Sequence, residues 1–259
     1  MFAAARSAGV FAAGSTYDPA VLEAGLWALL TAGSLWVGAL VAILARPGSR
    51  VVGLAIAFGA GALIAAVAYE LVLEAVETSV RFAAAGFAVG AVAFYVGDWL
   101  IDRRGGHDRK RMQQSGSLSE AAGAIVLGTV LDGIPESFVL GASLQTEGVI
   151  PVAVVIGVFV SNVPESLSAT TGLLQSGWSR ERLLLMWTAV VAVSIGAAAL
   201  GWWALDVVPA GGGAFALGFA AGALLVMLSD TLMPEALEHG GREAGLLTAL
   251  GFALGFALS

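Results

Sequence analysis

The chain has 259 residues, of which 58% are hydrophobic and 12% charged, and its mean hydropathy is +0.89. Soluble globular domains are about 25% charged, so this composition excludes that class and indicates a protein whose solvent is lipid. The net charge of −7 gives no reason to expect a nucleic-acid partner. Because there is no cysteine, disulfides and thiolate metal sites are excluded as well.

A membrane-spanning helix needs about 20 apolar residues to cross about 30 Å of hydrocarbon. Eight stretches meet this requirement, so the sequence predicts an all-α, polytopic membrane protein with eight transmembrane helices in a single domain over residues 21–258. Residues 1–20 are too short and too interrupted to span a membrane and are expected to form a short N-terminal segment. The predicted spans are 21–45, 51–73, 80–101, 120–143, 149–174, 182–204, 212–234 and 243–258.

Basic residues predict which ends of the spans face the cytoplasm, because cytoplasmic loops are enriched in Lys and Arg. Alternate loops collect ten of the twelve basic residues on one side, so both termini are expected outside the cytoplasm. The one long loop, 103–119, is basic and then rich in Gly, Ser and Gln, which predicts a flexible cytoplasmic connector. Arginine outnumbers lysine eleven to one and Ala and Gly are abundant, which indicates a high-GC prokaryote and therefore the cell membrane.

Two internal repeats are visible in the sequence. A shift of 161 residues places span 51–73 on span 212–234, and five spans of offset reverse the direction of crossing. This predicts an inverted repeat, which many secondary transporters use to alternate access to one site. A shift of 29 residues places the Pro-Glu-Ser of residues 135–137 on that of residues 164–166. Shared Ala/Gly composition is an alternative explanation for the first match, but it does not explain two Pro-Glu pairs in register.

Three carboxylates are predicted near the centres of spans, where each costs at least about 2.5–3.5 kcal/mol. Asp132 and Glu136 share a helix face because they are four residues apart. Ser161 and Glu165 repeat that spacing, with Asn162 at the edge of the same face. Two antiparallel helices would therefore enclose a cation site built from oxygen atoms. The alternative is that these acids only form hydrogen bonds to neighbouring helices.

A proline directly precedes each of the two glutamates. Proline disturbs the hydrogen bond of the carbonyl four residues back, here Leu131 and Val160. The sequence therefore predicts these two carbonyls as further candidate ligands of a cation, in a helix pair that is interrupted at membrane depth.

The remaining acids lie nearer the ends of their spans. Glu70 with Glu74, and Asp230 with Glu235, are expected either to cap the membrane interface or to line the entrance or exit of a pathway. Asp98 is expected in a cytoplasmic interface belt beside Trp99. The two histidines, His107 and His239, are expected at the surface.

The segments Asp-Gly-Ile-Pro-Glu-Ser at 132–137 and Ser-Asn-Val-Pro-Glu-Ser at 161–166 resemble the ZIP (Zrt/Irt-like) family of metal transporters, as in a divergent prokaryotic member. The resemblance extends from about residue 21 to the end of the chain. It implies eight spans in a 3+2+3 arrangement, often a homodimer, and movement of the fourth and fifth spans against the others. It also implies a divalent metal ion as the substrate (zinc, iron(II) or manganese) and no organic cofactor. The metal ligands implied by position are Asp132, Glu136, Ser161, Asn162 and Glu165.

This chain departs from the family pattern at several positions. Asp132 stands where the family usually has histidine, and Ser161 where it has glutamine or histidine. Loss of the imidazole predicts a harder site, which favours manganese or iron(II) relative to zinc. The sixth span, 182–204, contains no acid, so we expect a single-metal site.

These patterns favour a divalent metal transporter rather than an enzyme. A non-transporting relative that serves as a membrane metal sensor or a structural subunit is the first alternative, because the histidine is lost. An intramembrane enzyme is the second, although the surroundings of Asp98 and Asp132 are not of the glycine-rich catalytic type and no zinc-protease helix signature occurs.

Overall fold

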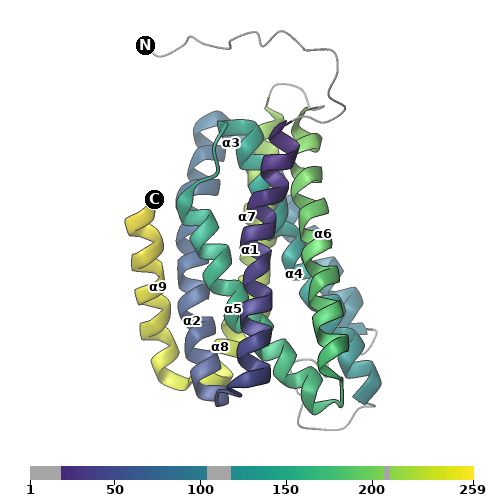
Figure 1. The fold of residues 1–259 in the computed structure, drawn as a ribbon. Helices are drawn as coiled ribbons and strands as arrows, with labels where there is room; N and C mark the ends of the chain where they lie inside the picture. The colour runs from purple at the N-terminus through teal and green to yellow at the C-terminus, as the bar shows by residue number, and fades with distance from the viewer. Residues whose placement is uncertain (1–18, 104–117, 207–210) are drawn as a thin grey trace.

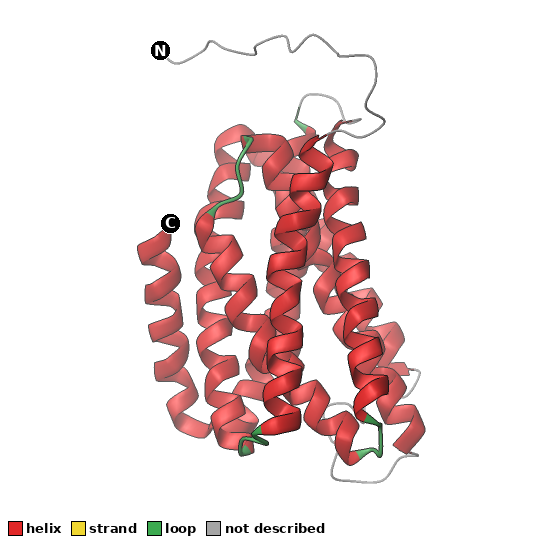
Figure 2. Ribbon diagram, in the orientation of Figure 1, coloured by secondary structure: helices red, strands yellow, loops and turns green. Residues whose placement is uncertain are grey.

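The computed structural model describes residues 19–103, 118–206 and 211–259, and the described chain is helical without strands (Figure 2). Six of its helical segments are long and apolar enough to cross a membrane, as expected for a multi-pass membrane protein. The predictions for most of the N-terminal segment 1–20 and of the loop 103–119 fall outside the described residues.

Four of the predicted spans are matched by one helix each. Their ends differ from the predicted ends by a few residues, because helices continue past the hydrophobic stretch until a turn stops them. A turn at Gly148 (φ 74°), for example, follows the fourth predicted span. The four helices are α1 (Pro19–Leu44), α4 (Leu118–Glu147), α5 (Val152–Gln175) and α6 (Arg180–Asp206).

The other two apolar segments are longer, and non-helical backbone interrupts each of them. Ser79 is extended (φ −167°, ψ 109°), and Gly241 has a positive φ of 66°. Each segment also contains a stretch of π-helix, which is wider than an α-helix. The first comprises α2 (Ser49–Ala66), the π-helix η1 (Val67–Val72) and α3 (Leu73–Arg103). The second comprises α7 (Gly212–Met227), the π-helix η3 (Leu228–Leu232), α8 (Met233–Gly240), the short 3₁₀-helix η4 (Gly241–Glu243) and α9 (Ala244–Leu258).

The helices form an elongated bundle in which α9 lies at one edge beside α2, and α6 lies at the other edge (Figure 1). Their contacts divide the bundle into two groups. In one group α1 packs against α5 and α6, and α4 packs against α6; in the other, α3 packs against α7, and α2 packs against α8 and α9. The contacts of α2 with α5 and of α4 with α7 join the two groups.

Glycines allow the helices of the second group to approach closely. A Cβ built on Gly90 of α3 would overlap the carbonyl oxygen of Phe219 in α7, and one on Gly251 of α9 would overlap the carbonyl oxygen of Phe58 in α2. In lipid, apolar burial gives helices no driving force to associate, so close packing of small residues takes its place. The packing of α3 on α7 and of α2 on α9 therefore depends on these glycines.

We expect Gly90→Ala to destabilise the bundle by about 1–3 kcal/mol, the usual cost of overpacking a tight contact. The measurement is thermal unfolding of the purified protein in detergent. Gly33→Ala in α1 is the matched control, because a Cβ there meets no atom within 4 Å. In the middle of a helix this change is neutral or stabilises by up to about 1 kcal/mol. Equal melting temperatures for the two variants would contradict the close approach of α3 and α7.

Candidate metal site

Asp132 and Glu136 lie one turn apart on α4. Pro135 precedes Glu136 without ending the helix. The residues are almost fully buried, with Asp132 2% exposed and Glu136 1% exposed. Their charges are close enough to repel one another. Burial of two neighbouring carboxylates is costly unless a cation or a proton neutralises them, so this pair is the natural centre of a cation site.

Ser161 connects this pair to the second Pro-Glu helix. Its Oγ on α5 lies 3.4 Å from Glu136 Oε1 on α4 and 3.0 Å from the carbonyl oxygen of Val158. A hydroxyl has one proton and two lone pairs. When the proton is donated to the nearer Val158 carbonyl, the Ser161 oxygen is an acceptor beside Glu136 and can share a cation with it.

Asn162 and Glu165 lie on the same part of α5. Glu165 is 8% exposed and follows Ser161 by one turn. The Asn162 side chain donates from Nδ2 to the carbonyl oxygen of Thr31 in α1 at 3.2 Å. Because α1 holds the amide nitrogen, the amide oxygen is the end of Asn162 that can bind a cation. Ser34 of α1 donates to the same Thr31 carbonyl, so α1 orients this side chain with a buried polar cluster of its own.

The structure brings together Asp132, Glu136 and Ser161 and places Asn162 and Glu165 on the adjoining turns of α5. Over residues 19–103, 118–206 and 211–259, no group of three or more His, Asp or Glu side chains is arranged to hold a metal ion. A complete shell of all five predicted ligands is therefore not formed in this conformation.

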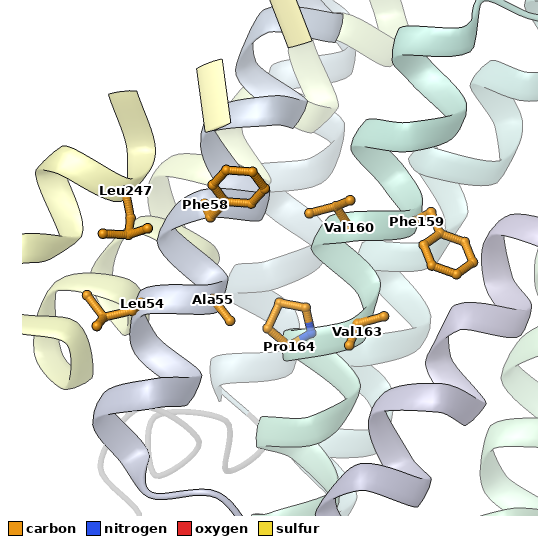
Figure 3. A pocket seen from close by; sticks show the side chains of 8 residues that line it. All are labelled: Leu54, Ala55, Phe58, Phe159, Val160, Val163, Pro164 and Leu247. Carbon is orange, nitrogen blue, oxygen red and sulfur yellow. The ribbon is translucent and has the colours of Figure 1, made fainter. Parts of the chain in front are cut away.

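The Val160 carbonyl, predicted as a ligand, lies on another side of α5. A Cβ built on Gly59 of α2 would lie 3.0 Å from this oxygen and 2.7 Å from the Cα of Ser161. Val160 and Pro164 also line an apolar pocket that faces α2 and α9 (Figure 3). Because α2 packs against α5 at this point, the prediction for Val160 is wrong.

An acidic group lies at the C-terminal end of α4. Glu147 is within electrostatic range of Glu74 in α3 and of Glu70 in η1. Sequence reasoning selected Glu70 and Glu74 but missed Glu147. Glu147 follows Glu136 by eleven residues, which is close to three helical turns, so the helical period could have placed it on the same face. Asp230, the third predicted pathway residue, lies half-buried in η3.

Glu235 in α8 is the other predicted pathway residue that has a partner across the bundle. Its Oε1 accepts a hydrogen bond from Ser168 of α5. Sequence reasoning missed Ser168, although it lies three residues after Glu165 and seven after Ser161, on the same side of the helix. The polar face of α5 therefore continues from Ser161 to α8.

Two of the peripheral predictions have different outcomes. Asp98 is 5% exposed and so is buried, not part of an interface belt. The cause is its neighbour Gly97, which lets α3 approach Leu131 of α4. Trp99 does fit such a belt, because it is 42% exposed and the Arg103 guanidinium lies 4.0 Å from the centre of its ring. His239 is exposed on α8, and His107 lies outside the described residues.

No protein-family model matches the chain, and no curated protein sequence matches it significantly. The assignment of the site therefore depends on its residues and their geometry.

We expect Asn162→Asp to lower the thermal stability of the metal-free protein by about 1–3 kcal/mol, because a carboxylate oxygen would face the Thr31 carbonyl in place of the amide donor. The control is Gln175→Glu, the same chemical change at an exposed position near the end of α5. Unfolding is followed in detergent with a chelator present. A loss no larger than that of the control would show that α1 does not hold Asn162.

Proposed function

We propose that this chain is a divergent ZIP-like transporter that moves divalent transition-metal ions across the cell membrane. Its metal ligands are Asp132, Glu136, Ser161, Asn162 and Glu165. The observation that carries the proposal is the contact between Ser161 of α5 and the buried Glu136 of α4, because it joins the two Pro-Glu motifs deep in the bundle. The metal ion is the substrate, and the proposal includes neither a reaction nor an organic cofactor.

The chemistry of the site favours a cation. Neither α4 nor α5 contains Lys or Arg, so no basic side chain on these helices can neutralise the pair of Asp132 and Glu136. A divalent ion would remove the repulsion between the two carboxylates and bind them together. All the proposed ligands are oxygen atoms, which favours manganese or iron(II) relative to zinc.

Eight crossings of the membrane form part of the proposal. The apolar segment Ser49–Ile101 has 53 residues and Gly212–Leu258 has 47. As straight helices they would be roughly 70–80 Å long, more than twice the hydrocarbon thickness of about 30 Å. Each is interrupted, at Ser79 and at Gly241. Two crossings for each segment, added to the four single helices, give eight spans with both termini outside the cytoplasm.

Matching contacts support the inverted repeat. Gly61 of α2 packs against Thr248 of α9, and Gly222 of α7 packs against Phe87 of α3. The shift of 161 residues converts Gly61 into Gly222 and Phe87 into Thr248, so the two contacts are equivalent. The same shift places the start of η1 on the start of η3. These equivalences are expected if the two halves are related by a two-fold axis in the membrane plane.

The two packing groups suit the relative movement that alternating access requires. The proposed ligands lie on α4 and α5, in the group that meets the rest of the bundle through α2 and α7. Two polar regions adjoin the site along these helices. Glu147 with Glu70 and Glu74 lies at one end of α4, and Ser168 with Glu235 lies beyond Glu165 on α5. We assign them to the outer and inner ends of the pathway respectively.

Single cysteines test the crossings, because the chain has none of its own. We expect cysteines at Glu77 and Thr146 to react with an impermeant reagent added outside cells, and a cysteine at Ser117 to react only after the membrane is opened. Glu77 directly precedes the interruption at Ser79, so it distinguishes one crossing by this segment from two. Reaction of Glu77 from the same side as Ser117 would contradict the eight-span arrangement.

Glutamine substitutions test the shared site. Glu136→Gln and Glu165→Gln should each lose at least about 90% of manganese uptake into proteoliposomes, and the double variant should bind metal little worse than either, because one ion held jointly makes the losses non-additive. Glu181→Gln, exposed near the start of α6, is the control. Calorimetry measures binding separately from uptake. Additive binding losses would exclude a shared site, and binding without uptake in the unmodified protein would favour the metal sensor.

A further inference from the structure

An apolar groove lies outside the metal site, between α2, α5 and α9. Its volume is about 470 Å³, within the range of ligand sites. The labelled side chains of all three helices surround it (Figure 3). The lining residues are Leu54, Ala55, Phe58, Phe159, Val160, Val163, Pro164 and Leu247.

Local sequence explains why this space is open. Ala55 is exposed and ends at its Cβ, so α2 presents no long side chain between Leu54 and the next turn. Pro164 on the opposite wall has a compact ring. The walls are nevertheless held close together, because Gly59 of α2 packs directly against Ser161 of α5 one turn further along. The groove is therefore formed by the backbone geometry of α2 and α5.

Basic residues lie at one end of the groove. Arg50 precedes Leu54 by one turn on α2, and Arg242 precedes Leu247 by five residues at the start of α9. Both side chains are exposed. Arg50 donates to Glu243 at 2.7 Å, which draws its guanidinium toward the α8–α9 connection. A second hollow, lined by Arg242, Glu243, Gly245 and Leu246, lies at this end.

We propose that an anionic phospholipid of the bilayer binds here, with an acyl chain in the groove and its phosphate at Arg242 and Arg50. Water does not stably fill an apolar space, whereas an acyl chain suits it. The guanidinium of arginine matches the geometry of phosphate oxygens. The groove begins about 6 Å along the helix from Arg50, at the 1.5 Å rise per residue, which suits a headgroup and the chain attached to it. Basic pockets between helices on the cytoplasmic side of membranes bind anionic lipids in this way.

The lipid would contact the metal-bearing helix directly. Val160, Val163 and Pro164 line the groove, and they alternate along α5 with Ser161, Asn162 and Glu165. The acyl chain therefore covers the outer side of the same turns whose inner side carries the proposed ligands. Binding of the lipid itself requires only that the chain spans a membrane, so it does not depend on metal transport.

Native mass spectrometry of the full chain, purified in mild detergent with equal phosphatidylglycerol and phosphatidylcholine, tests this proposal. We expect phosphatidylglycerol to be retained preferentially. Arg242→Gln should reduce that preference about fivefold, the change expected for one basic side chain at an anionic surface. Ala55→Trp should reduce the retention of both lipids, because the indole would fill the groove. Arg182→Gln and Val193→Trp, exposed positions on α6, are the matched controls and should retain lipid as the unmodified protein does.

A second measurement keeps the test independent of the folding of Ala55→Trp. Phosphatidylglycerol with a photoreactive group on its acyl chain, in vesicles with the unmodified protein, should label peptides of α2, α5 and α9 near Leu54, Val160 and Leu247. Equal retention of the two lipids, or equal losses in the groove variants and the α6 controls, would overturn the proposal. Labelling spread evenly over the lipid-facing helices, or cross-links showing a second copy of the chain in the groove, would overturn it too.

Discussion

Two carboxylates buried one turn apart on α4 are the constraint on which the rest of this molecule depends. Asp132 and Glu136 repel one another inside a bundle whose other contacts are almost entirely apolar. The polar side chains that accompany them are concentrated on the facing helix, where Ser161 reaches Glu136 and Asn162 is held by α1. In lipid, a group of this kind is retained only where its binding energy for a cation, or its hydrogen bonds, offset the cost of burial.

Close contact between backbones is what makes such a polar interior compatible with a stable bundle. Gly59 places α2 against the turn of α5 that carries Ser161, and Gly38 places α1 against Val163 on the same helix. These contacts hold α5 from two sides without long side chains. The helix that carries half of the proposed site is therefore positioned by small residues, because lipid offers no hydrophobic force to press the helices together.

The helical period and the charge pattern predicted the helices and the central residues, but the sequence contained no signal for several of the decisive contacts. Spacing by four placed Asp132 with Glu136 and Ser161 with Glu165, because a helix repeats every 3.6 residues whatever surrounds it. The partner of Asn162 is a backbone carbonyl, which every residue has, so no side-chain pattern marks Thr31. The errors at Val160 and Asp98 have one cause: which side of a helix meets its neighbour is decided by tertiary packing, and distance along the span does not reveal it.

The two π-helices have a consequence for how this chain can change during evolution. A π-turn holds more residues than an α-turn, so loss of one residue from η1 would restore an α-helix and rotate all that follows by about 100°. Glu74 and the whole packing face of α3 would then turn away from α7. Equal numbers of residues separate Gly61 from Ser79 and Gly222 from Gly240. Selection in these two stretches therefore acts on chain length more strongly than on residue identity, and substitutions accumulate there more readily than insertions or deletions.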